Sequence, residues 1–419
     1  MYSANTIVRL AKKNLDKIYG EKSAEASKRI AKAVNEFIKL YGEGDFSVFS
    51  VSGRSEICGN HTDHNLGEVA AASIDLDIIA VAREVKGSII RVKSEGFDED
   101  VVDIKVLKPQ SEEAGKSAAL IRGVVDGLKK IGRKYGAFVA YTTNQIKKGS
   151  GLSSSAAFED MIGTIENYIY NEGKIGFTEI AQLGQYSENK FFGKPCGLMD
   201  QIACAAGGFV HIDFKDPANP KTEKVKFDPE KHGYALYIVD TGGSHVNLTP
   251  DYASVPAEMK SVAELFGQKT LRGITEKKLI SKTNEIREKL GDRAMLRAIH
   301  FVRENDRVRD LFKALRNDDI EEFLNVVRLS GNSSATLLQN CYSVTDVKEQ
   351  GILLACAIAE SVVGEKGAFR VHGGGFAGTI QAYVPLDKEK LFVRKMSESF
   401  GKDSVTKLRI RPYGAVKVL

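Results

Sequence analysis

The segment Lys148–Ala157, KGSGLSSSAA, concentrates glycine and serine directly ahead of a stretch with helical periodicity. In that stretch Phe158, Ile162, Ile165 and Ile169 recur at intervals of four, three and four, which keeps one face of a helix apolar. A loop that enters a helix N-terminus offers unpaired backbone N–H groups and roughly half a positive charge, and both attract an anion. The segment therefore favours a phosphate site, although a flexible linker or an ordinary helix cap has the same composition. It does not fit the P-loop pattern, because no lysine follows the last glycine.

Composition limits the classes of function that remain. A chain of 419 residues, 42% of them hydrophobic, is long enough to form two domains with separate cores. The net charge of +5 is a small remainder of 60 basic and 55 acidic residues, so neither a nucleic-acid nor a membrane partner is indicated. The sequence shows no signal peptide and no apolar run long enough to span a bilayer, which predicts a cytoplasmic protein. Five widely spaced cysteines predict reduced thiols.

Helical and strand patterns alternate along the chain and predict an α+β fold in two halves. An amphipathic helix is expected over Ser23–Leu40, and a mostly helical region over residues 292–329, with Asp318 or Asp319 as a helix cap. Strands are predicted around residues 90–92, 102–106, 210–214, 234–239 and 379–384. The proline-containing stretch DPANP at residues 216–220 is the best candidate boundary, which divides the chain into domains 1–215 and 216–419.

Three further clusters carry polar or glycine residues that suit a binding site. Residues 52–65, SGRSEICGNHTDHN, bring together Arg54, Asn60, His61, Asp63 and His64. Such a set can form hydrogen bonds with the hydroxyl groups of a sugar. Alternatively, His61, Asp63 and His64 can hold a metal. A solvated polar turn has the same composition.

The second and third clusters are shorter. In residues 188–201, ENKFFGKPCGLMDQ, Asp200 follows a Pro-Cys-Gly turn and lies between apolar Met199 and Gln201. A partly buried carboxylate there needs a charged partner or takes part in proton transfer, and a helix-capping role is equally compatible with the sequence. Residues 370–379, RVHGGGFAGT, place four glycines before a predicted strand and allow a close approach of the backbone.

Taken together, the clusters resemble the galactokinases of the GHMP kinase superfamily. GRSEICGNHTDHN is similar to the galactokinase signature GRVNLIGEHTDYN, and KGSGLSSSAA is similar to the ATP motif of the superfamily. PCGLMDQ resembles the family's CGIMDQ, and GGGFAG at residues 373–378 resembles its C-terminal glycine motif. The resemblance covers most of the chain, from about residue 45 to the end. Agreement of several long motifs in order makes a chance match improbable.

The resemblance implies an N-terminal domain like ribosomal protein S5 domain 2 and a ferredoxin-like C-terminal domain, with the active site in the cleft between them. It implies a sugar 1-kinase that phosphorylates the anomeric hydroxyl of galactose or a close relative with ATP. Asp200 is then the expected catalytic base and Arg54 the cation beside it. Physical chemistry supports this pair, since a guanidinium keeps a carboxylate ionised and offsets charge that develops on a transferred phosphoryl group.

The remaining residues are assigned to ligands by the same resemblance. Asn60, His61, Asp63, Gly197 and Tyr252 occupy positions that contact the sugar in the family. The ATP motif carries the cofactor-binding residues Gly149, Ser150, Gly151, Leu152, Ser153, Ser154 and Ser155. Ser155 and Glu188 are expected to hold Mg²⁺ on the phosphates. The expected partners are therefore a small sugar and ATP, with the protein a monomer or a weak homo-oligomer.

Two departures from the family signature bear on the choice of sugar. Asn60 replaces a glutamate that in the family bonds the hydroxyl at sugar carbon six, and His64 replaces a tyrosine. Removing a like charge about 4 Å from a carboxylate relieves roughly 4 kcal/mol at an effective dielectric near 20, so galacturonate becomes an alternative to galactose. A protonated His64 would favour the acid further. A simple exchange of one hydrogen bond for another is the competing interpretation.

Two hypotheses that assign the chain to other classes of function remain. A catalytically silent sensor of sugar and ATP would share the same motifs, but related sensors lack residues of the GLSSSAA loop, and here Ser155 and Ala156 are present. A metal-dependent hydrolase built on His61, Asp63 and His64 would bind Zn²⁺ and be indifferent to ATP.

Overall fold

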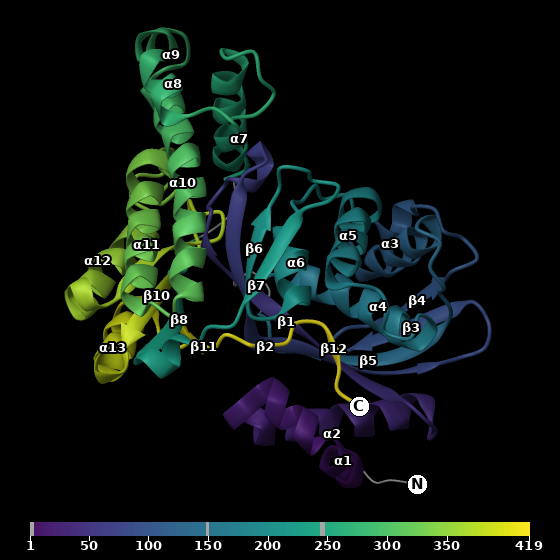
Figure 1. Ribbon diagram of the computed structural model, residues 1–419. Helices are drawn as coiled ribbons and strands as arrows, with labels where there is room; N and C mark the ends of the chain where they lie inside the picture. Colours follow the sequence, from purple (N-terminus) through teal and green to yellow (C-terminus); the bar gives the residue numbers. More distant parts are fainter. Residues whose placement is uncertain (1–3, 148–150, 244–247) are drawn as a thin grey trace.

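The computed structural model describes residues 4–147, 151–243 and 248–419 (Figure 1). Two of the predicted ATP-motif residues, Gly149 and Ser150, lie outside the described residues. Within them the predicted α+β class is confirmed, because helices pack on two separate sheets.

The larger sheet has strand order β12-β1-β2-β5-β3-β4, and β6 and β7 extend it from the first half of β2. Long β2 makes this possible, since Glu68–Ala72 pairs with β6 while Ile78–Glu84 pairs with β5. The strands are β1 (Ser47–Cys58), β2 (Glu68–Glu84), β3 (Ile89–Ser94), β4 (Glu99–Asp103), β5 (Phe138–Asn144), β6 (Phe209–Asp213), β7 (Lys221–Val225) and β12 (Val416–Lys417).

Helices cover both faces of this sheet (Figure 1). On one face lie α1 (Ala4–Tyr19) and α2 (Ser23–Tyr41), and apolar side chains such as Ile30 and Phe37 of α2 are buried against the sheet. Helix α2 confirms the predicted amphipathic segment and ends at Gly42, whose φ of 77° few other residues adopt. On the other face lie α3 (Ser117–Lys130), α4 (Ser154–Tyr170), α5 (Phe177–Ser187) and α6 (Met199–Ala206).

The smaller sheet is antiparallel, in the order β11-β8-β10-β9. Its strands are β8 (Tyr234–Asp240), β9 (Ala368–His372), β10 (Thr379–Pro385) and β11 (Val405–Leu408). Helices α12 (Gly351–Val363) and α13 (Glu389–Phe400) share an apolar core with it, and α11 (Ile320–Ser333) contacts β9 from the other side. Strands β8 and β10 confirm two of the predicted strands.

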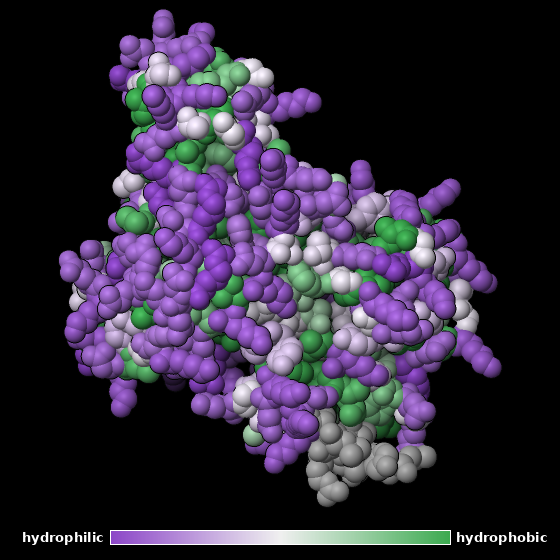
Figure 2. All heavy atoms as spheres, in the orientation of Figure 1, coloured by the Kyte–Doolittle hydropathy of each residue, from purple (hydrophilic) through white to green (hydrophobic). Residues whose placement is uncertain are grey.

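A group of helices extends beyond both sheets (Figure 1). It contains α7 (Thr249–Glu264), α8 (Glu276–Ser281), α9 (Thr283–Leu290) and α10 (Asp292–Arg316), which form a core of their own. The predicted helical region is thus split into α10 and α11, and Asp319 caps α11 by accepting a hydrogen bond from the backbone of Glu322. Hydrophilic residues cover most of this face of the molecule (Figure 2). No helix within the described ranges is both long and apolar enough to cross a membrane.

The chain does not leave the larger sheet at the proline-containing stretch. Residues 216–220 connect β6 to β7, which pair with each other, and β12 returns from the C-terminus to β1. The larger sheet therefore contains strands from both sides of residue 215, and the division into domains 1–215 and 216–419 stays a prediction. All five cysteines are free thiols.

Candidate active site

The serine-rich segment meets strand β1 at the start of helix α4. The backbone N–H of Arg54 donates to the carbonyl of Leu152 at 3.3 Å, and a Cβ on Gly53 would lie 2.9 Å from that carbonyl oxygen. Ser153 precedes α4 with φ 61° and ψ 57°, a left-handed conformation that costs a residue other than glycine roughly 1–2 kcal/mol. Such strain is maintained where the surroundings fix the backbone, which is common at functional sites.

Asp200 and Arg54 form a bidentate ion pair in front of this segment. Nε of Arg54 donates to Oδ1 of Asp200 at 2.8 Å, and Nη2 donates to Oδ2 at 2.7 Å. The Arg54 side chain is 8% exposed, while that of Asp200, in the first turn of α6, keeps 35% exposure. Arg54 also donates to the carbonyl of Gly151. The carboxylate is therefore fixed beside the serine-rich segment and still accessible from outside.

Ser153 completes the surroundings of the carboxylate. A serine in this position usually caps its own helix, but no side-chain capping bond is present at α4, and the Ser153 hydroxyl donates to Oδ2 of Asp200 instead. Burial opposes ionisation of Asp200. The charge of Arg54 and the hydrogen bonds from Arg54 and Ser153 outweigh it, so the pKa of Asp200 lies below its usual value. Asp200 is thus an ionised and partly accessible carboxylate.

The segment between β1 and β2, residues 59–67, is here called the HTD loop. Thr62 shapes it, because its hydroxyl lies 2.9 Å from the carbonyl oxygen of Gly59 and 2.7 Å from that of Glu68, and its single hydrogen is shared between them. The loop places Asp63 against the segment that leads to Asp200, since a Cβ on Gly197 would lie only 2.5 Å from Oδ2 of Asp63. Two predicted sugar residues from distant parts of the sequence are therefore in contact.

The two histidines of the HTD loop have a fixed arrangement of protons. Nε2 of His61 lies 2.9 Å from the carbonyl of Gly374, so this nitrogen must carry a hydrogen. Nδ1 of neutral His61 then accepts from Nε2 of His64 at 3.3 Å. Desolvation and the nearby His61 lower the pKa of His64 and the charge of Asp63 opposes them, although the residue itself is exposed to solvent. The idea that a protonated His64 would favour an acidic sugar stays a prediction.

Residues 373–378, here called the glycine loop, connect β9 to β10 and receive hydrogen bonds from the predicted sugar residues. The hydroxyl of Tyr252 donates to the carbonyl of Gly375 at 2.8 Å, and Asn60 donates to that of Gly373 at 2.8 Å. A Cβ on Gly374 would lie 2.7 Å from Cε1 of Tyr252, so this approach requires glycine. The structure thereby brings Asn60, His61 and Tyr252 to the same loop.

Comparison with known proteins agrees with this arrangement. The galactokinase galactose-binding signature matches residues 35–84, and the N-terminal domain of GHMP kinases matches residues 119–208. Galactokinase of Glaesserella parasuis is 32% identical over 88% of this chain and 93% of its own length. Galactokinase of Clostridium tetani is 30% identical over 88% of this chain and 91% of its own length. The chain belongs to the galactokinase family.

The fold is shared by solved structures of a galactokinase and of a mevalonate kinase. The structure of Lactococcus lactis galactokinase complexed with galactose superposes with a TM-score of 0.77, at 21% identity, over 91% of this chain and 98% of that protein. Mevalonate kinase of Methanococcus jannaschii gives a TM-score of 0.59 at 15% identity, over 88% and 99% of the two chains. The predicted GHMP kinase fold is therefore confirmed.

The residues predicted to hold Mg²⁺ in this galactokinase-family chain lie at the starts of two different elements. Ser155 is in the first turn of α4, and Glu188 begins a π-helical turn that follows α5. Buried Glu188 accepts from Nε2 of Gln201 at 3.2 Å and pairs with Lys194 at 3.3 Å. One hydroxyl and one carboxylate suit Mg²⁺, which takes few protein ligands and fills its shell with phosphate and water oxygens.

Across the described parts of the chain, no group of three or more His, Cys, Asp and Glu side chains is placed to hold a metal ion by itself. His61, Asp63 and His64 therefore do not form the zinc site that a hydrolase would need. Sequence reasoning missed two contacts of the site: the bond from Ser153 to Asp200, and the approach of Asn340 to the HTD loop. For the second contact, the run of glycines at residues 373–375 indicated a close approach of the backbone but did not identify Asn340 as the partner.

Proposed function

We propose that this protein is an ATP-dependent sugar 1-kinase that phosphorylates the anomeric hydroxyl of galactose or a closely related neutral sugar. Family membership supports the reaction type, because the curated relatives named above are galactokinases. One observation in the structure carries the proposal. The Arg54–Asp200 pair places an ionised carboxylate between the serine-rich segment and the residues of the HTD loop.

In the proposed reaction the proton of the anomeric hydroxyl passes to Asp200. The sugar oxygen then bonds to the γ-phosphorus of ATP, the bond from that phosphorus to the β–γ bridging oxygen breaks, and ADP leaves. Arg54 has two effects: it keeps Asp200 ionised before the reaction, and its charge offsets the negative charge that builds up on the reacting oxygens. A positioned base contributes roughly 10²- to 10⁴-fold, and the alignment of the two substrates supplies much of the rest.

Phosphate binding is assigned to residues 149–155. The first turn of α4 has no side-chain cap, so its amides and the partial positive charge of the helix end can receive the phosphates. Ser155 and Glu188 would hold Mg²⁺, which when bound neutralises phosphate charge. His61, Asp63, Gly197 and Tyr252 would contact the sugar. A separate role for Asn60 is argued in the next subsection.

A neutral sugar is favoured over galacturonate. The acid would need positive charge near carbon six, but Nδ2 of Asn60 donates to the carboxylate of Glu56 at 2.9 Å, and desolvation lowers the pKa of His64. None of the relatives named above is described as acting on an acidic sugar. The pairing of Asp200 with Arg54 also supports an active kinase over a silent sensor.

A coupled assay of ADP release over a panel of monosaccharides tests the proposal. Galactose, galacturonate, N-acetylgalactosamine and glucose are supplied with ATP and Mg²⁺, and the product is checked for phosphate at carbon one. We expect turnover with galactose and no measurable turnover with galacturonate. Absence of turnover with every sugar in the panel, by protein that still binds ATP, would overturn the proposal in favour of the sensor.

A further inference from the structure

The amide of Asn60 is fully used by other parts of the protein. Its Nδ2 donates to Oε1 of Glu56 at 2.9 Å and to the carbonyl of Gly373 at 2.8 Å, so both hydrogens are engaged. Its Oδ1 accepts from Nδ2 of Asn340 at 2.7 Å. Only 1% of the residue is exposed. A sugar hydroxyl could reach this amide only by replacing one of these bonds.

Asn340 fixes the other side of the contact. It is fully buried, and its Nδ2 also lies 3.1 Å from the carbonyl of Gly374. The backbone carbonyl of Asn340 accepts from the backbone N–H of Phe376 at 2.5 Å. A Cβ on Gly375 would lie 2.1 Å from that carbonyl oxygen, so nothing larger than glycine fits here. Asn340 therefore joins the glycine loop to the HTD loop through Asn60.

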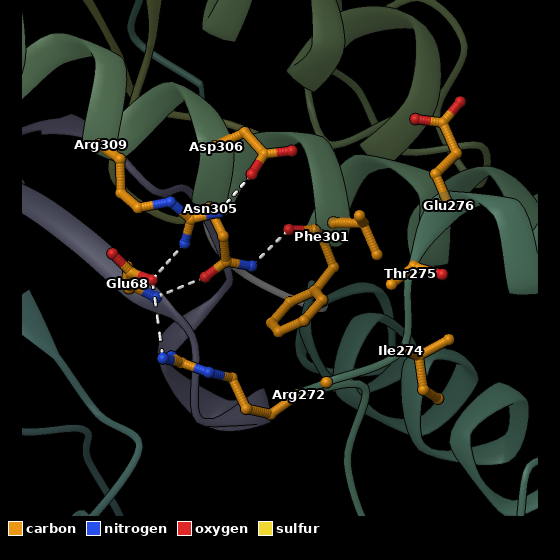
Figure 3. A pocket seen from close by; sticks show the side chains of 11 residues that line it. Glu68, Arg272, Ile274, Thr275, Glu276, Phe301, Asn305, Asp306 and Arg309 are labelled. Carbon is orange, nitrogen blue, oxygen red and sulfur yellow. Dashed lines mark hydrogen bonds and ion pairs between the residues drawn. The ribbon is translucent and has the colours of Figure 1, made fainter.

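The HTD loop is also held at both of its ends by helix α10. At the first end, the backbone N–H of Gly59 donates to Oε1 of Glu304 at 3.0 Å. At the second end, the backbone N–H of Glu68 donates to Oδ1 of Asn305 at 2.7 Å. Asn305 lines a cavity of about 350 Å³, which is shown in Figure 3. Arg272, in the same cavity, donates to the carbonyl of Leu66 at 2.7 Å. Between these ends, Asn60 links the loop to the smaller sheet.

Neighbouring charge explains why an amide stands at this position. Oε1 of Glu56 accepts from Asn60 and also lies 3.2 Å from Nη2 of Arg370. A carboxylate at residue 60 could not donate to Glu56 or to the carbonyl of Gly373, and it would repel Glu56 at close range. The amide is thus required by the surrounding protein, whatever the ligand.

We propose that Asn60 and Asn340 are positioning residues, which hold the HTD loop on the glycine loop so that His61 and Asp63 are placed for the sugar. Asn60 then forms no hydrogen bond with the hydroxyl at sugar carbon six. The inference rests on the proposed function for its ligand, but the contact between the two loops can be tested without turnover.

The kinetic test compares galactose with 6-deoxygalactose, which lacks the hydroxyl in question. Wild type, Asn60→Ala, Asn340→Ala and the double variant are assayed with both sugars. We expect each single variant to lower kcat/KM about tenfold, mostly through KM, and by the same factor for the two sugars. The double variant should lose little more than either single one, because both break the same contact. A loss with Asn60→Ala that is confined to galactose, with Asn340→Ala unaffected, would overturn the proposal.

Hydrogen exchange supplies a readout that is independent of catalysis. Both single variants should increase amide exchange in residues 59–67 and 373–378, and unchanged exchange in both segments would contradict the proposal even if activity falls. Asn167→Ala is the matched control, because this buried asparagine bonds the backbone of Ile175 at 2.9 and 3.0 Å, away from both loops. The control should lower the melting temperature without changing KM for sugar. Asn60→Ser replaces Asn60→Ala if the latter does not fold. Wild type that phosphorylates no sugar would disprove the proposed function, while the exchange data would still decide the role of Asn60.

Discussion

At the scale of single residues, Asp200 is controlled by two side chains from different parts of the chain. Arg54 comes from β1 and Ser153 from the start of α4, while the carboxylate itself is in α6. Burial alone would raise the pKa of this carboxyl, and the partners reverse that effect. A carboxylate kept ionised in this way is in the form that the proposed role as a base requires at neutral pH.

Substituting Asp200→Asn should abolish turnover while leaving ATP binding intact. The amide keeps the size of the side chain but accepts a proton poorly, so we expect kcat to fall by at least roughly 10²-fold. Single-turnover measurements of ADP release, together with calorimetric titration of ATP, check both parts. Substantial residual activity would assign the base role elsewhere or indicate transfer without a base.

Ser153 offers a test of the lowered pKa of Asp200. Ser153→Gly removes a hydroxyl that favours the ionised carboxylate, so the pKa of Asp200 should rise and the acid limb of kcat/KM should move to higher pH. Glycine also accepts φ near 61° without strain, so the free energy of unfolding should increase by about 1 kcal/mol.

Ser153→Ala is the control for the glycine variant. It removes the same hydroxyl but keeps a Cβ in the left-handed conformation, so its acid limb should move as in Ser153→Gly without a gain in stability. Identical pH profiles for wild type and both variants would show that the hydroxyl does not influence the base. Profiles of kcat/KM that extend below about pH 4, the ordinary pKa of an aspartate, up to neutral pH distinguish these results.

The sequence made part of this site predictable. Asp200 follows apolar Met199 after a Pro-Cys-Gly turn, which suggested a partly buried carboxylate with a charged partner or a role in proton transfer, and the structure pairs it with Arg54. The orientation of Ser153 could not be predicted, because a serine before a helix ordinarily bonds its own backbone. Nor could the contacts of Asn60, since its partner Asn340 lies 280 residues further along the chain. Contacts of that separation depend on how the two sheets meet.

At the scale of elements, the HTD loop and the turn before α6 approach each other through Gly197. No side chain fits between the turn and Asp63, because a Cβ would lie 2.5 Å from the carboxylate. Periodicity predicted α2 and α4, and short apolar runs predicted β8 and β10, which are buried on both faces over almost their whole length. The loops between elements have no such period, and their shapes depend on partners elsewhere in the fold.

Gly197→Ala should therefore displace Asp63 and weaken sugar binding. We expect KM for sugar to rise about tenfold, with KM for ATP unchanged, because the methyl group acts on the HTD loop alone. The matched control is Gly176→Ala, where a Cβ meets nothing within 4 Å and φ is −72°. Steady-state kinetics with each substrate varied in turn measures both constants. An unchanged KM for sugar in Gly197→Ala would show that Asp63 does not take part in sugar binding.

At the scale of the whole molecule, one buried carboxylate ties the two ends of the chain together. Asp77 is fully buried in β2 and accepts from Tyr19 at 2.6 Å, from Arg29 at 2.7 Å and from Arg411 at 3.0 Å. Burial opposes its charge, but Arg29 and Arg411 outweigh burial and hold the pKa of Asp77 below its usual value. The N-terminal helices and the C-terminal segment are thus joined at one point under the larger sheet.

Asp77→Asn should destabilise the fold by about 3–5 kcal/mol, because Arg411 would remain buried without its counter-charge. A depressed pKa in the folded state gives stability at pH values above the unfolded pKa, and this stability is lost as pH falls through the folded pKa. The difference between wild type and variant should accordingly be constant near neutral pH and shrink below about pH 4. Urea unfolding at several pH values measures it. A difference that grows on acidification would exclude this role for Asp77.

The position of Arg411 has a consequence for synthesis of the protein. A chain emerging from the ribosome presents Asp77 early, whereas Arg411 follows 334 residues later. Until then one of the two guanidinium groups that offset this carboxylate is missing, and so is β12, which completes the edge of the larger sheet beside β1. The larger sheet is therefore completed only once residues 411–417 have emerged, and ribosome-bound chains stalled before Arg411 should remain sensitive to protease.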